Sequence, residues 1–206
     1  MLDQPGYGDT YGFHRIFSNG YFHYRTFSKT PKLKFVLAIS KNDLTGTAEK
    51  FKKTIFNFIN SFENWEDKQV DGKTKVGVKN QILKAISLLI TKADPNTKVE
   101  NLKSMIINLR ESVAGMGSRQ KLKYQGLLDE IVKTNRIYFI EKPKNIHQST
   151  LDSPILQKIY DESVFWERPV HKNKNVVEME EIHFSVSNEI LKEIRDRDNE
   201  LFREDF

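Results

Sequence analysis

Two short motifs in this chain carry residue types at spacings that could do chemistry. Asp3 and Gly6 form an Asp-x-x-Gly motif, and Thr91, Lys92 and Asp94 form a Thr-Lys-x-Asp motif after a short apolar run. An aspartate at a strand end can hold a Mg²⁺-bound water, and a glycine lets a backbone N–H approach a phosphate oxygen. A carboxylate can accept from the ring N–H and the exocyclic amine of guanine, while a lysine stem lies against the base. The first motif therefore suits a terminal phosphate with its magnesium, and the second suits a base.

Each motif also has a simpler interpretation. Asp-x-Pro-Gly is a common turn composition, and Asp94 followed by Pro95 can start a helix. A second approximate match, Ser-Lys-Asn-Asp at 40–43, also follows an apolar run. The Gly-x-x-x-x-Gly-Lys-Ser/Thr loop that would hold the phosphates occurs nowhere in the sequence. Whether the motif residues can form a binding site depends on the strands and helices that position them.

Apolar periodicity predicts those elements. Three short apolar runs with β-branched or aromatic members are typical of buried strands. Stretches with apolar residues at three- and four-residue spacing lie between them and predict amphipathic helices. The strands are expected at 33–39, 85–90 and 136–140, and the helices at 47–62, 98–113 and 122–133. This alternation predicts an α/β fold of three layers, in which helices flank a mainly parallel sheet. Ligands of such sheets bind beyond the carboxyl ends of the strands, where both motifs are expected.

The remaining segments carry weaker patterns. A glycine-rich turn leads into an aromatic stretch at 13–27, which we interpret as a helix packed on the sheet or on a partner. The charged, aperiodic stretch at 63–79 predicts a surface loop or an insertion. Further helices are expected at 153–166 and 189–206. We therefore expect a partial domain at 1–145 and a helical C-terminal extension at 146–206.

With these motifs in this order, the chain resembles the P-loop GTPases over about residues 2–142. In that family the Asp-x-x-Gly turn is followed by helix, strand, helix, a strand ending in Asn/Thr-Lys-x-Asp, helix, strand and helix. The same order here favours 91–94 over 40–43 as the base-reading turn. The proline before Gly6 and the glycines after it look more like septin, dynamin or immunity-associated GTPases than like Ras-type ones.

The resemblance implies GTP and GDP as ligands, with Mg²⁺ as the metal ion. It implies that Asp3 holds the metal and that the nucleotide contacts come from Gly6, Thr91, Lys92, Asp94, Glu141 and Lys142, the last two in the family's final base-contacting loop. It also implies hydrolysis of GTP to GDP and phosphate. Tyr7 follows Gly6 where Ras-like members carry a water-orienting glutamine, so no catalytic residue is assigned.

The chain departs from the family by lacking the phosphate loop and the first strand. That strand would lie in the middle of the sheet, and its loss would expose an apolar strand edge at 35–39. We expect the chain to be the C-terminal part of a longer G domain, a truncated product or a degenerate relative. Nucleotide binding by this chain alone should then be weak or nil. The alternative is a non-enzymatic protein-interaction module on the same scaffold, of which a homodimer is one version.

The amino-acid composition limits the kinds of partner, metal site and location that this chain can have. The 206 residues include 33 basic and 28 acidic side chains that are interleaved along the chain, which indicates a solvated surface rather than a nucleic-acid face. There is no cysteine, so disulfides and thiolate chemistry are excluded. The five histidines are scattered, and no apolar stretch approaches the roughly 18 residues of a membrane span. These features predict a soluble cytoplasmic protein.

Overall fold

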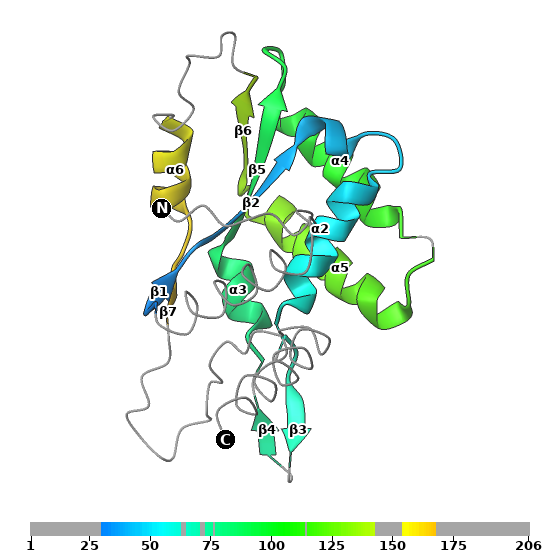
Figure 1. Ribbon diagram of the computed structural model, residues 1–206. Helices are drawn as coiled ribbons and strands as arrows, with labels where there is room; N and C mark the ends of the chain where they lie inside the picture. The colour runs from blue at the N-terminus through cyan, green and yellow to red at the C-terminus, as the bar shows by residue number, and fades with distance from the viewer. Residues whose placement is uncertain are drawn as a thin grey trace, which may run out of the picture.

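The structure is a computed structural model, and it describes residues 30–62, 65–70, 73–75, 77–113, 115–142 and 154–167 (Figure 1). Asp3 and Gly6 lie outside the described residues, as do the aromatic stretch at 13–27 and the charged segment at 189–206. Among the described residues, no helix has the length and apolar character needed to cross a membrane.

A parallel sheet of three strands forms the centre of the described part. Its strands are β2 (Phe35–Ser40), β5 (Ile86–Ala93) and β6 (Ile137–Glu141), in the order β2-β5-β6. The register runs from Phe35 opposite Ile86 to Ser40 opposite Thr91, and Leu88 lies opposite Ile137. The central strand is buried over its first five residues, which explains its nearly continuous apolar sequence. The expected strands and their parallel arrangement are confirmed.

Helices cover both faces of this sheet. α2 (Glu49–Asn60), α4 (Val99–Glu111) and α5 (Ser118–Lys133) share one hydrophobic core with the side chains of β2 and β5 that alternate toward them. On the other face, Ile159 of α6 (Pro154–Glu162) packs with Leu89 and Tyr138 in a smaller cluster. Figure 1 shows α6 on one side of the sheet and the other three helices on the opposite side. The coarse α/β architecture is therefore as expected.

Part of the stretch at 63–79 forms regular secondary structure. Its described residues include an antiparallel hairpin of β3 (Lys68–Val70) and β4 (Lys73–Lys75), so of the two expectations, a surface loop or an insertion, the plain loop is corrected. Each strand has three residues, which is too short for a period-two pattern to be recognised. The intervening Asp71-Gly72 is a dipeptide typical of two-residue hairpin loops and was the available signal.

Three further elements had no sequence signal of their own. α3 (Lys79–Ala85) directly precedes β5 and buries Ile82, Leu83 and Ala85. The helix expected to reach 166 ends at Glu162, and the chain then forms β7 (Trp166–Glu167), which pairs antiparallel with β1 (Lys32–Leu33). Two-residue strands depend on the partner strand rather than on a local pattern, so only the fold reveals them.

Candidate functional site

The two Ser/Thr-Lys-x-Asp sequences lie side by side at the carboxyl edge of the sheet. Ser40 ends β2 directly opposite Thr91 of β5, because the two strands are parallel and in register. The Thr91 hydroxyl donates to the carbonyl of Ile39 at 3.4 Å, which ties the end of β5 to β2. The chain after Ser40 forms a short 3-10 helix, η1 (Lys41–Leu44). Sequence order favoured 91–94 as the base-reading turn, and the structure brings the competing sequence to the same place.

A β-bulge shapes the end of β5. Ile90 pairs with Phe139 and Ala93 pairs with Glu141, so two residues of β5 lie where β6 has one. The second of the two is Lys92, whose φ of 56° is in the left-handed region that non-glycine residues rarely adopt. Bulges re-aim side chains and often adjoin functional sites. The exposed Lys92 thus occupies a strained position inside the predicted motif.

Asp94 follows the bulge and pairs with a lysine from the neighbouring strand. Its side chain is 72% exposed and forms an ion pair with the ammonium of Lys41, whose side chain is 24% exposed. The same ammonium lies 3.4 Å from the Thr97 hydroxyl. The Thr97 N–H donates to the Asp94 carbonyl at 2.9 Å, which closes the turn. A carboxylate has about four lone-pair sites, so Asp94 keeps acceptor capacity beyond this ion pair.

The end of β6 joins the same edge. Lys142 donates its backbone N–H to the Ala93 carbonyl at 2.9 Å, and both Glu141 and Lys142 are exposed. The structure therefore brings together five predicted site residues: Thr91, Lys92, Asp94, Glu141 and Lys142. Asp3 and Gly6 lie outside the described residues. The contact of Lys41 with Asp94 was not anticipated, although the similarity of 40–43 to 91–94 was a signal for it.

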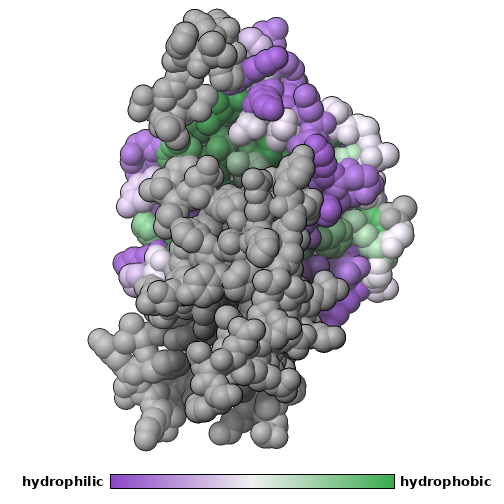
Figure 2. Space-filling view, in the orientation of Figure 1, coloured by the Kyte–Doolittle hydropathy of each residue, from purple (hydrophilic) through white to green (hydrophobic). Residues whose placement is uncertain are grey.

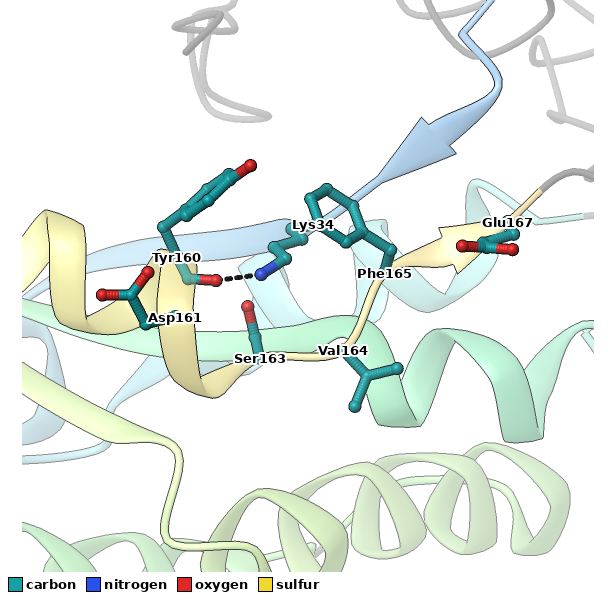
Figure 3. A pocket seen from close by; sticks show the side chains of 7 residues that line it. All are labelled: Lys34, Tyr160, Asp161, Ser163, Val164, Phe165 and Glu167. Atoms are coloured by element: carbon teal, nitrogen blue, oxygen red, sulfur yellow. Dashed lines mark hydrogen bonds between the residues drawn. The ribbon is translucent and has the colours of Figure 1, made fainter.

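A cluster of side chains around Lys34 lines a cavity of about 500 Å³ where α6 meets β7 (Figure 3). The Lys34 ammonium donates to the Tyr160 carbonyl, and it lies 4.4 Å from the Tyr160 ring centre and 4.2 Å from that of Phe165. Desolvation lowers the pKa of Lys34, and the nearby Asp161 carboxylate partly opposes this. Lys34 thereby ties α6 to the start of β2. None of the predicted site residues lines this cavity.

A second cavity, of about 470 Å³, lies against α2 and the connection between α4 and α5. It too is lined by none of the predicted residues. Among the residues that the structure describes, no three histidine, aspartate or glutamate side chains are grouped so that they could hold a metal ion. The proposed magnesium ligand Asp3 lies outside them.

Comparison with known proteins found no relative of this chain: no family model, no curated protein and no solved structure matches it. A functional proposal therefore rests on the residues at the carboxyl edge of the sheet and on the motif resemblance.

Proposed function

We propose that the carboxyl edge of the sheet is the base-recognition part of a guanine-nucleotide site, in a protein related to the P-loop GTPases. The observation that supports this most is the position of Asp94. It is an exposed carboxylate directly after the central strand. Lys41, in the loop that ends β2, pairs with it, and Lys142, in the loop that ends β6, donates its N–H to the carbonyl of the preceding residue, Ala93. Convergence of loops at this edge is typical of ligand sites in open parallel sheets.

The chemistry assigned to each residue follows from its donors and acceptors. The Asp94 carboxylate would accept from the ring N–H and the exocyclic amine of guanine, and the stem of Lys92 would lie along the base. Thr91 holds the turn to β2, and the N–H of Lys142 holds the last loop to β5. Glu141 and Lys142 would complete the loop around the base.

Phosphate and Mg²⁺ contacts, by the motif resemblance, would come from Gly6 and Asp3. The phosphate loop of the family is not in this sequence. Base recognition would also have to compete with Lys41 for the Asp94 carboxylate. Both points support weak binding of GTP or GDP by this chain.

The test is base selectivity, because it does not require tight binding. GTP, ITP and XTP, each with MgCl₂, are titrated against the ¹⁵N-labelled chain while backbone amide shifts are followed. ITP lacks the exocyclic amine, and XTP replaces it with a carbonyl. We expect GTP to bind most tightly, with shifts at Lys92, Asp94 and Lys142. Asp94→Asn should lose the preference for GTP and favour XTP, because an amide can donate to the new carbonyl.

Asp43→Asn is the matched control, since Asp43 occupies the corresponding position in the competing sequence. It should leave the order of the three nucleotides unchanged. If Asp43→Asn alters the order and Asp94→Asn does not, base reading belongs to 40–43. Equal binding of all three nucleotides to the unaltered chain would refute a base-reading site at this edge.

A second candidate is a protein-interaction module on the same scaffold. It is favoured by the exposed side chains of Tyr160 and Val164, which are 55% and 58% exposed beside the cavity at α6. Sedimentation velocity over a concentration series would detect a homodimer. If that dimer uses this surface, Val164→Asp should shift it to monomer while Val99→Asp, on α4, should not.

A further inference from the structure

The cavity on α2 combines positive charge with apolar surface. Its lining comes from the first two turns of α2 and from the connection between α4 and α5: Glu49, Lys50, Lys52, Lys53, Phe56, Gly115 and Met116. We call it the lysine cavity. Helical spacing places 49, 52, 53 and 56 on neighbouring positions of one face of α2. On the face of the molecule drawn in Figure 2, hydrophilic side chains gather over the region where α2 lies, with apolar side chains between them.

The charge of the lysine cavity is poorly balanced by its own residues. Three lysines face one glutamate in the lining, which leaves a net charge of +2 for the lining residues. Outside the lining, the Asp43 carboxylate lies 4.0 Å from the ammonium of Lys50, whose side chain is 84% exposed. The Lys52 side chain is only 14% exposed, and its ammonium lies 3.2 Å from the Ser112 hydroxyl and 3.7 Å from the Glu49 carboxylate. Glu49 is 76% exposed, so solvent screens this pair. An ammonium has three donors, so a largely buried one gains from an anionic acceptor.

Apolar groups form the other part of the lining. The Phe56 ring is held by stacking on Tyr124, with ring centres 5.3 Å apart and an angle of 21° between the planes. Met116 adds an adaptable thioether side chain. Gly115 has a φ of 81° and would have open space even around an added Cβ. A ligand with an apolar body therefore has both room and a contact surface.

We propose that the lysine cavity binds a phosphate monoester of an apolar or aromatic alcohol. Its phosphate, with a charge of about −1.5 to −2 at pH 7, matches the net charge of the lining. Lys50, Lys52 and Lys53 contact the phosphate oxygens, and Phe56 and Met116 contact the organic part. This site is separate from the proposed base-recognition edge and does not depend on it.

Phenyl phosphate is the probe, compared with inorganic phosphate and with sodium chloride at the same ionic strength. Amide shifts of the ¹⁵N-labelled chain locate and quantify the binding. We expect saturable shifts at Lys53, Gly115 and Met116, with phenyl phosphate binding more tightly than inorganic phosphate. Lys53→Gln should weaken binding about tenfold, as for one lost charge-assisted hydrogen bond. The control Lys84→Gln, an exposed lysine of α3 outside the cavity, should not.

Phe56→Leu should reduce the advantage of phenyl phosphate while leaving inorganic phosphate unchanged. Lys53 is exposed, so its variant keeps the fold, which the urea midpoint verifies. Asp94→Asn should have no effect, which separates this site from base recognition. Equal losses for Lys53→Gln and Lys84→Gln, or the same shifts with sodium chloride, would overturn the proposal. So would phenyl phosphate binding no more tightly than inorganic phosphate.

Discussion

Replacing Lys92 with glycine should stabilise this protein, although glycine normally weakens a strand. Lys92 lies in the β5 bulge with a φ of 56°, where its Cβ is crowded by the backbone. Its side chain is exposed, and no hydrogen bond or ion pair of its ammonium occurs within the described part of the chain. The substitution therefore acts through the backbone.

The magnitude follows from two opposing effects. A non-glycine residue in the left-handed region costs about 1–2 kcal/mol, which glycine removes. Glycine also loses more conformational freedom on folding, at a cost of about 0.5–1 kcal/mol. The difference predicts a net stabilisation of about 0.5–1 kcal/mol. With a urea dependence near 2 kcal/mol per molar, the unfolding midpoint should rise by about 0.4 M.

Urea unfolding followed by far-UV circular dichroism measures this change. Lys92→Ala is the matched control, because it removes the side chain but keeps the backbone strain, and it should leave the midpoint nearly unchanged. Lys92→Val should lower the midpoint, since a β-branched residue tolerates positive φ least. The reasoning fails if Lys92→Gly lowers the midpoint or if Lys92→Ala raises it as much as glycine does.

Four other predictions concern two glycines, the titration of a buried tyrosine and the hydrogen bonds of a buried arginine. Gly77→Ala should destabilise by about 1–3 kcal/mol, because the new Cβ would lie 2.4 Å from the Glu66 carbonyl carbon. By contrast, Gly126→Ala, in open space within α5, should stabilise by about 1 kcal/mol. Urea unfolding midpoints measure both changes, and shifts of the same sign in the two variants would contradict this reasoning. Burial raises the pKa of the Tyr124 hydroxyl above its usual range. In the unfolded chain this hydroxyl ionises near pH 10, so its contribution to folding stability is present below about pH 10 and is lost as the pH rises above that value. The drop in urea midpoint from pH 8 to pH 11 should therefore be smaller in Tyr124→Phe, and an unchanged drop would refute this. Arg136→Met should lower the free energy of unfolding by about 2–4 kcal/mol, because the buried guanidinium donates to the carbonyls of Leu83 and Lys84 near the end of α3. Thermal unfolding measures the change, and a loss under about 1 kcal/mol would show that these two hydrogen bonds contribute little.

The main elements of the described part were predictable because their signals are local. The apolar run at 85–90 is continuous because β5 is central and covered on both faces. The periodic apolar residues of α2, α4 and α5 became the faces buried in the larger core. Parallel strands also place their carboxyl ends at one edge, so 91–94 and 141–142 could be expected to meet there. Their role in binding guanine stays a prediction.

Features that depend on contacts between distant segments of the chain were not predictable from the sequence. The β1–β7 pair has two residues on each side, and neither strand carries a pattern of its own. The Asp94–Lys41 ion pair joins residues 53 positions apart, and it forms because β2 and β5 lie in register. The bulge at Lys92 likewise follows from a shift in the pairing of β5 with β6.

The sequence by itself determined the three strands of the parallel sheet and the helices α2, α4 and α5, since hydrophobic periodicity acts within a few residues and is independent of the rest of the chain. It also supplied the two motifs and the absence of a phosphate loop. Only the tertiary structure decided that the two Ser/Thr-Lys-x-Asp sequences lie next to each other, that Lys41 pairs with Asp94, and that three lysines share a cavity with Phe56 and Met116. Those outcomes depend on strand register and on helix packing, which are set by long-range contacts that no local stretch of sequence contains.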